Sequence, residues 1–325
     1  MVELKEINKF YSYNNDHEPG LPADSWFQEP PEGLTLFIVL YTQTCRWSRC
    51  LGCNLPSLMS EHHISYRDIM QQIDYIFNTI LDDTKKKDLK KIILSNNGSV
   101  LDEKTFSTTA LMYFIAMMNM NCPGIETLTL ETRPEYVDWE ELEVLSRALK
   151  EGDTQTKLEV AIGFEAFDDT IRNDYFRKGL ELKIFEEFAA RMAKYKFRLK
   201  TYFMLKPVPQ ITEEEGVEDI KKGVDYLHDI ACRHGLDINM HLNPTYVARG
   251  TPLEDAFRQG TYTPPELESV TEIIRHAKDK KISLFIGLDD EGLAVEGGSF
   301  IREGDETLAK KMQEFNRTQD YGLFP

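Results

Sequence analysis

The sequence predicts an α/β fold in which parallel strands alternate with helices. Seven apolar runs rich in β-branched residues have the character of buried strands: residues 34–41, 91–94, 127–130, 158–164, 199–205, 238–242 and 282–286. Six stretches with helical spacing separate them: residues 66–81, 104–118, 139–150, 184–196, 213–233 and 265–280. Because strand and helix alternate, we expect right-handed crossovers, in either a β/α barrel or an open doubly wound sheet.

Length and composition limit the class of protein further. At 325 residues and 41% hydrophobic content, the chain can bury a core the size of one large α/β domain. No apolar run approaches the roughly 18 to 20 residues of a membrane span, and the start lacks a secretory pattern, so we expect a cytoplasmic protein without a membrane partner. The net charge of −17 argues against a broad basic surface for nucleic acid.

Polar residues follow the apolar runs directly. In parallel β/α folds the chemistry takes place beyond the carboxyl ends of the strands. Six segments are therefore expected to meet at one mouth: residues 42–53, 95–99, 131–135, 163–165, 204–207 and 241–244.

The first of these segments carries three cysteines, Cys45, Cys50 and Cys53, at C-x4-C-x2-C spacing. Three thiolates on one loop can converge on a metal centre, and their softness favours zinc or iron–sulfur. A structural zinc site needs a fourth ligand, which His62 or His63 can supply. A four-iron, four-sulfur (4Fe-4S) cluster held by three cysteines instead leaves one iron open. The position directly after a buried first strand favours the cluster.

Ordered motifs beyond the cysteines extend the pattern. They are Glu131-Thr132-Arg133-Pro134-Glu135, Gly163-Phe164-Glu165, Arg177-Lys178-Gly179, the stretch 200–207, Asn243-Pro244 with Val247, Gly250 and Thr251, and Tyr262 with Pro264-Pro265. With them the chain resembles the radical S-adenosylmethionine superfamily, in particular the radical subunit of archaeosine synthase and its uncharacterised relatives. It is more distantly similar to the radical domain of the Elongator catalytic subunit. The resemblance covers residues 33–280, although the cysteine loop has one residue more than the superfamily's commonest spacing.

The resemblance implies a partial (β/α)6 barrel of TIM type over residues 34–287. Residues 1–33 are then an irregular N-terminal arm, and residues 288–325 form a C-terminal cap. The resemblance also implies that the three cysteines hold a 4Fe-4S cluster whose open iron is chelated by S-adenosyl-L-methionine. The segment that would hold the methionine amino group contains Asn96, Asn97, Gly98 and Ser99, for which an ordinary β-to-α turn is the alternative.

Two glutamates end apolar strands, where an unpaired carboxylate is costly to bury. Glu131 and Glu165 are therefore expected to meet either the ribose hydroxyls of the cofactor or the cations Arg133, Arg177 and Lys178. A structural salt bridge between neighbouring loops is the alternative. Arg177 or Lys178 can also pair with the methionine carboxylate.

Period-two alternation predicts the inward face of the fifth strand. The residues on this face are Lys200, Tyr202, Met204 and Lys206. Tyr202 and Lys206 are candidate catalytic residues, with Lys206 placed to meet an anionic group of cofactor or substrate. His241 and Asn243 alternate in the same way on the sixth strand and are candidates to contact adenine or substrate.

The sequence thus predicts an enzyme of lyase or transferase type. An external one-electron donor of flavodoxin or ferredoxin type would reduce the cluster, and the deoxyadenosyl radical would abstract hydrogen inside the barrel. The family resemblance suggests a modified nucleoside, in tRNA, as substrate, while a small molecule or delivery by a partner protein stays open. The alternative is a zinc-stabilised, non-catalytic binding module that uses the same cysteines.

Overall fold

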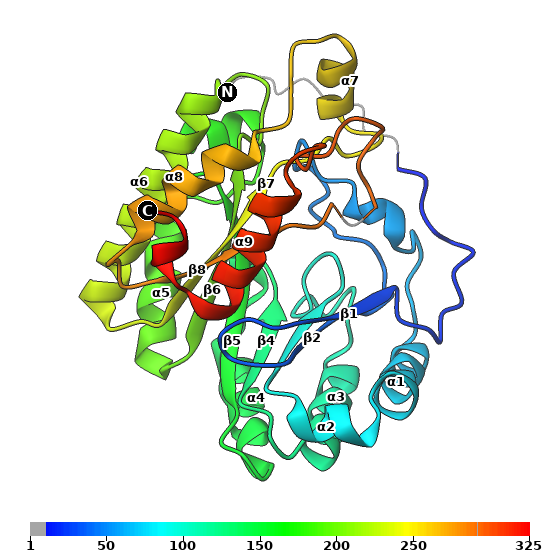
Figure 1. The fold of residues 1–325 in the computed structure, drawn as a ribbon. Helices are drawn as coiled ribbons and strands as arrows, with labels where there is room; N and C mark the ends of the chain where they lie inside the picture. The colour runs from blue at the N-terminus through cyan, green and yellow to red at the C-terminus, as the bar shows by residue number, and fades with distance from the viewer. Residues whose placement is uncertain (1–10, 291) are drawn as a thin grey trace.

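The computed structural model describes residues 11–290 and 292–325, and its centre is one eight-stranded sheet. The strands are β1 (Asp24–Gln28), β2 (Thr35–Val39), β3 (Lys91–Ser95), β4 (Thr127–Glu131), β5 (Lys157–Glu165), β6 (Arg198–Leu205), β7 (Ile238–Pro244) and β8 (Ser283–Ile286). They lie side by side in chain order, with β1 and β8 at the edges. The sheet curls without closing, which confirms the predicted partial barrel of TIM type (Figure 1).

Strands β2 to β8 pair in parallel, as the alternation of strand and helix predicts. Strand β1 pairs antiparallel with β2, from Asp24 opposite Val39 to Gln28 opposite Thr35. The expected N-terminal arm is therefore not wholly irregular. Its segment 24–28 extends the sheet, and Trp26 stacks on Phe37 with ring centroids 4.2 Å apart. The first ten residues of that arm lie outside the described residues.

Helices surround the sheet, most of them on its outer face, while α7 lies beyond the carboxyl ends of the strands (Figure 1). They are α1 (Tyr66–Tyr75), α2 (Asp83–Asp88), α3 (Thr108–Asn121), α4 (Trp139–Ala148), α5 (Leu182–Tyr195), α6 (Glu213–His234), α7 (Pro252–Arg258), α8 (Leu267–Ala277) and α9 (Glu306–Thr318). Each predicted helix matches one of these within a few residues, while α2, α7 and α9 come in addition. Among the described helices, none has both the length and the apolar character needed to cross a membrane.

Local signals explain where several helices begin. The Ser65 hydroxyl accepts from the Asp68 amide at the start of α1, and the Asp138 carboxylate accepts from two amides at the start of α4. The long helix α6 starts with a capping box between Thr212 and Glu215 and ends at Gly235, whose φ is +65°.

The main apolar core lies between the sheet and these helices, and a smaller apolar cluster lies at the carboxyl ends of the strands. The smaller cluster includes Leu51 of the cysteine loop, Ile171 and Phe176 of the segment after β5, and Val247 and Leu253 of the segment after β7. The cysteine loop is thus packed onto two neighbouring loops by apolar contacts. This packing fixes the loop over the mouth of the barrel.

The inner face of the sheet is polar, unlike the layers of branched apolar side chains that usually fill TIM barrels. Thr129 of β4 donates to Glu159 of β5 at 2.8 Å, and Lys200 of β6 donates to Asn239 of β7 at 2.7 Å. The β5 positions on this face above Glu159 are Ala161 and Gly163. Because they are small, side chains of β4 and β6 can meet across β5.

Candidate metal and cofactor site at the carboxyl ends of the strands

The loop that carries the three cysteines follows β2 and is tied to the rest of the mouth by hydrogen bonds. The Leu51 amide donates to the Phe176 carbonyl at 2.8 Å, and the Trp47 indole donates to the Arg177 carbonyl at 3.0 Å. Both acceptors lie in the segment after β5. The cysteine loop therefore sits at the edge of the sheet where the predicted chemistry belongs.

Cys45, Cys50 and Cys53 are free thiols, each half-buried. All three are close enough to Tyr11 that their charges add to the effect of burial in raising the pKa of that phenol. Burial raises the pKa of Cys50, while the positive charge of Lys178 acts in the opposite direction. The thiols thus share one half-buried region beside a buried cation.

Within the described ranges, no three histidine, cysteine or acidic side chains form a preassembled metal site. The donor set nevertheless fits an iron–sulfur cluster by its chemistry, because three soft thiolates lie on one loop. His62 and His63, which the zinc alternative requires, are exposed. Metal binding would require the loop to close around its metal.

Two buried polar atoms beside this loop have no hydrogen-bond partner in the described part of the chain. They are Oδ1 of Asn96, after β3, and Nη1 of Arg133, after β4. An acceptor and a cationic donor left open in this way match the amino and carboxylate groups of an amino-acid moiety. This observation fits the predicted cofactor.

The segment after β3 lies directly against the cysteine loop. A Cβ on Gly98 would come within 3.3 Å of the Cys45 Cα, so glycine allows the two backbones to approach. The Ser99 hydroxyl accepts from the Arg133 amide at 3.1 Å. Asn97, with φ of +53°, places its amide nitrogen 3.5 Å from the sulfur of Met59. The structure therefore brings all four predicted residues of this segment to the mouth.

Glu165 and Lys178 form a buried ion pair with 2.7 Å between Oε1 and Nζ. Burial lowers the pKa of Lys178, but the charge and hydrogen bond of Glu165 together with the charge of Cys50 outweigh burial, so the pKa is raised. A bulge between Gly163 and Glu165 aims this glutamate, whose φ is +73°. A Cβ on Gly163 would collide with both partners, so the glycine makes room for the pair.

Arg133 and Trp47 form the wall next to this ion pair. The Arg133 guanidinium lies 4.3 Å from the Trp47 ring centroid and donates to the Lys178 carbonyl at 3.0 Å. On the exposed side Arg49 lies 5.1 Å from the same indole. Trp47 is thus held between two cations, which links the cysteine loop to the segments after β4 and β5.

Glu131 at the end of β4 accepts a hydrogen bond from the Tyr202 hydroxyl of β6. Burial raises the pKa of Glu131, whereas hydrogen bonds from Ser95 and Tyr202 act in the opposite direction. Because Tyr202 reaches Glu131, the predicted inward face of β6 is correct for this tyrosine. The two side chains bridge β4 and β6 across the small residues of β5.

His241 and Asn243 lie beside Tyr202 on the inner face of β7. The His241 ring lies 5.0 Å from the Tyr202 ring and 4.7 Å from Phe285 of β8. Burial lowers the pKa of His241 well below its usual value, and the positive charge of Lys200 adds to this effect. Its Nδ1 atom lacks a hydrogen-bond partner among the described residues. This histidine is therefore neutral at physiological pH.

The structure places Lys206 elsewhere than predicted. Its φ of +57° turns the chain at the end of β6, and its amine lies 3.3 Å from Glu213 Oε2 and 3.4 Å from the Thr263 hydroxyl. Lys206 therefore lies at the start of α6 rather than beside Tyr202. The predicted facing does not extend to Lys206 because period-two alternation holds only while the strand continues. The role of Lys206 at an anionic group of cofactor or substrate stays a prediction.

Positive φ angles are concentrated at this end of the barrel. Ser48, Asn97, Glu165, Arg177 and Lys206 have φ between +44° and +73°. Such conformations cost about 1 to 3 kcal/mol each in non-glycine residues and gather at functional sites. Four of the five are predicted site residues, and Ser48 is in the cysteine loop.

Sequence reasoning did not single out Tyr11. Its hydroxyl lies 3.4 Å from the Ser48 carbonyl and 3.2 Å from the Cys53 carbonyl, so it bridges two turns of the cysteine loop. No sequence signal marked this residue, because an isolated tyrosine in an arm resembles any other. Gly163, by contrast, stood in a recognised motif, and its role was not identified.

No family model matches the chain. A Methanocaldococcus jannaschii protein described as uncharacterized is 24% identical over 308 residues, which are 92% of this chain and 80% of that protein. The archaeosine synthase subunit beta of Methanosarcina acetivorans is 27% identical over 307 residues, 92% of this chain and 84% of its own length.

Among solved structures, the archaeal Elp3 of Methanocaldococcus infernus with an N-terminal deletion superposes with a TM-score of 0.52. It is 16% identical, and the match covers 79% of this chain but 59% of that one, so it supports the fold alone. Together with the motifs at the strand ends, the sequence comparisons confirm the predicted resemblance of this chain to the archaeosine synthase beta subunit.

Proposed function

We propose that the protein is a radical S-adenosylmethionine enzyme of the cytoplasm whose Cys45, Cys50 and Cys53 hold a 4Fe-4S cluster. When bound and reduced by one electron, such a cluster supplies reductive cleavage of S-adenosylmethionine to a 5'-deoxyadenosyl radical, which abstracts hydrogen from a substrate. The observation that carries the proposal is the position of the thiols. They lie on one loop at the carboxyl end of β2, beside open buried groups suited to an amino acid.

The chain's own residues would orient the cofactor. Asn96 offers a carbonyl acceptor for the methionine amino group, and Arg133 offers a donor for the methionine carboxylate. Glu131 is placed at the inner face, where its carboxylate can accept from ribose hydroxyls. Trp47 and the apolar cluster around Leu51 would limit water access to the loop.

The substrate class is proposed from the relatives. The name of the relatives, archaeosine synthase, supports a modified nucleoside as the substrate and a role in tRNA modification. The net charge of −17 favours delivery of an RNA by a partner protein over direct binding to a broad face of this chain. The electron donor would be a flavodoxin or ferredoxin.

Anaerobic reconstitution with iron and sulfide tests the cluster. The wild type should bind about four irons per chain and absorb broadly near about 400 nm. Cys50→Ala should lose the cluster, and 5'-deoxyadenosine formation from S-adenosylmethionine with dithionite should fall to background. Cys232→Ala is the matched control, because Cys232 is an exposed thiol on α6. Equal iron in the two variants, or wild-type protein that takes up zinc alone, would overturn the proposal.

A further inference from the structure

A cavity of about 230 Å³ lies at the amino-terminal ends of the strands, opposite the cysteine loop. Its walls include Lys91 of β3, Arg198 and Lys200 of β6, Asn239 of β7 and Ser283 of β8. The segment 30–32 before β2 covers it from one side. We call it the amino-terminal cavity. Its volume corresponds to several water molecules, each of which occupies about 30 Å³ in the liquid.

The most deeply buried charges at this cavity do not balance. The side chain of Lys91 and the residue Lys200 are each 4% exposed, while Glu159, 1% exposed at its side chain, is the matching buried carboxylate. Glu159 contacts Lys91 at 2.7 Å and also lies 3.5 Å from Arg198. The remaining carboxylates, Glu32 and Asp237, are more exposed and therefore more screened by water. The other buried cation has no carboxylate in contact with it among the described residues, and Glu159, Glu32 and Glu131 act on it only at longer range.

That charge is on Lys200. Its ammonium donates to Asn239 Oδ1 at 2.7 Å, and no carboxylate lies within ion-pair distance of it among the described residues. An ammonium has three donors, so two remain for other acceptors. Burial, with the charge of Lys91 adding to it, lowers the pKa of Lys200 to about 8. A buried cation in this situation gains from any anion that reaches it.

We propose that the amino-terminal cavity binds a small monoanion of the carboxylate class, which Lys200 and Lys91 hold together. One negative charge balances the one unmatched buried cation, which disfavours a dianion. The Ser283 hydroxyl accepts from the Asn239 amide at 2.9 Å and keeps its own proton to donate to an anion. Phe285 of β8 lines the cavity as an apolar wall. The site is separate from the cysteine loop and does not depend on a cluster.

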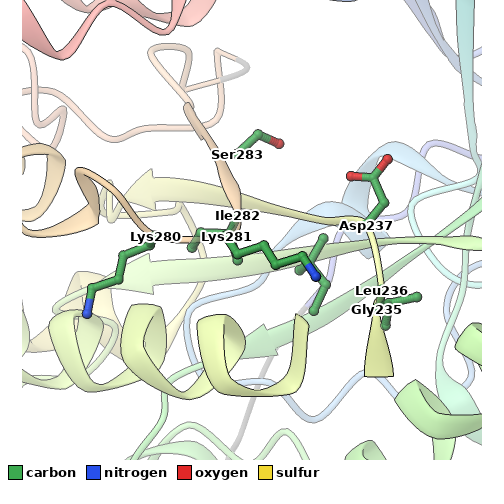
Figure 2. Close-up of a pocket in the computed structure, with 8 residues that line it drawn as sticks. Gly235, Leu236, Asp237, Lys280, Lys281, Ile282 and Ser283 are labelled. Carbon is green, nitrogen blue, oxygen red and sulfur yellow. The ribbon is translucent and has the colours of Figure 1, made fainter. Parts of the chain in front are cut away.

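A second hollow, of about 400 Å³, adjoins this cavity. It is lined by residues 235–238 and 280–283, so Asp237 and Ser283 border both spaces (Figure 2). Its own lysines are engaged with α6. Lys280 contacts Asp225 at 2.5 Å, and Lys281 donates to the Ala231 carbonyl at 3.2 Å. The charge proposed to bind the anion therefore lies not in this hollow but on Lys200, which lines the amino-terminal cavity.

Acetate titration of the protein without metal tests the proposal. At constant ionic strength, acetate should raise the melting temperature and give a saturable heat in calorimetry, whereas chloride should not. Lys200→Met should weaken acetate binding at least about tenfold, which corresponds to about 1.4 kcal/mol. Lys281→Met removes the same charge in the neighbouring hollow and should change the dissociation constant less than about twofold. Sulfate, a dianion, should bind more weakly than acetate.

Asn239→Asp keeps the test valid if Lys200→Met does not fold. The substitution is isosteric and places a carboxylate 2.7 Å from the Lys200 amine, so it supplies the missing negative charge internally. This variant should be more stable than the wild type and should lose acetate binding. If acetate has no effect on the wild type beyond that of chloride, or binds equally to Asn239→Asp, the cavity holds water alone and the proposal is wrong.

Discussion

Lys178 donates to Glu165 at 2.7 Å in a pair whose side chains are 11% and 12% exposed, and both charges act on Cys50. The pair joins the bulged end of β5 to the segment that follows it. Both residues belong to the predicted cofactor site. Its energetics can be tested without any cofactor.

Removal of one partner of this pair should strongly destabilise the protein. Lys178→Met leaves the Glu165 carboxylate buried without its counter-ion, which should lower the free energy of unfolding by about 3 kcal/mol. Urea unfolding measures the change. The double variant Lys178→Met with Glu165→Gln should lose less unfolding free energy than the sum of the losses in the two single variants. The reason is that Glu165→Gln removes the carboxylate charge that Lys178→Met leaves unpaired. Lys221→Met breaks a 2.9 Å pair with Glu218 on the surface and should cost less than about 1 kcal/mol.

Gly179 should tolerate alanine poorly, for two reasons that can be separated. Its φ is +66°, and an added Cβ would collide with the Trp47 ring. Gly260 has φ of +71° with no atom within 4 Å of its Cβ position, so Gly260→Ala measures the backbone cost alone, about 1 to 2 kcal/mol. Gly179→Ala should cost about 1 to 3 kcal/mol more and shift tryptophan fluorescence. Equal losses of unfolding free energy in the two variants would show that the Trp47 ring moves aside without a measurable cost.

Protonation of Glu159 should account for part of the loss of protein stability at low pH. Burial raises the pKa of its carboxyl, but the charges of Lys91, Arg198 and Lys200 and the hydrogen bond from Lys91 together outweigh burial and lower it to about 2. A carboxyl with a lowered folded-state pKa stabilises the fold above its unfolded pKa of about 4.3 and loses that contribution as the pH falls toward about 2.

The difference in unfolding free energy between wild type and Glu159→Gln should therefore shrink from about 3 kcal/mol near pH 7 to nearly zero near pH 2. Urea unfolding across this range measures it. Glu272→Gln removes one partner of an exposed ion pair with Lys221 and is the control. Its unfolding free energy should change with pH in the same way as that of the wild type. A difference for Glu159→Gln that does not change with pH would contradict the assignment.

Tyr11 should restrain the cysteine loop in the metal-free protein. Tyr11→Phe removes the hydroxyl that contacts the Ser48 and Cys53 carbonyls, so the loop should open more often. Iodoacetamide alkylation of Cys50 and Cys53, followed by mass spectrometry, should then be several-fold faster. Tyr13→Phe is the control, since its ring lies 6.0 Å from the Tyr11 ring in the same arm. Unchanged alkylation rates would exclude this role.

Much of the fold follows from local pattern. The seven apolar runs became β2 to β8 because their period and composition suit buried parallel strands, and the cysteine loop follows the first of them as predicted. Strand β1 was missed, because its residues 24–28 read as part of an irregular arm and are recruited only by pairing with β2. The sequence offered Lys178 as one of the possible partners of Glu165, and the structure pairs the two.

What the sequence by itself determined is the succession of strands and helices, the cysteine spacing and the inward face of β6 up to Tyr202, because these depend on neighbours in the chain. Only the tertiary structure decided that Tyr202 meets Glu131 across Ala161 and Gly163, that Lys206 turns toward α6, and that Lys200 borders a cavity without a carboxylate partner. Those relationships depend on the curl of the sheet and on backbone turns at strand ends, which bring together residues far apart in the sequence.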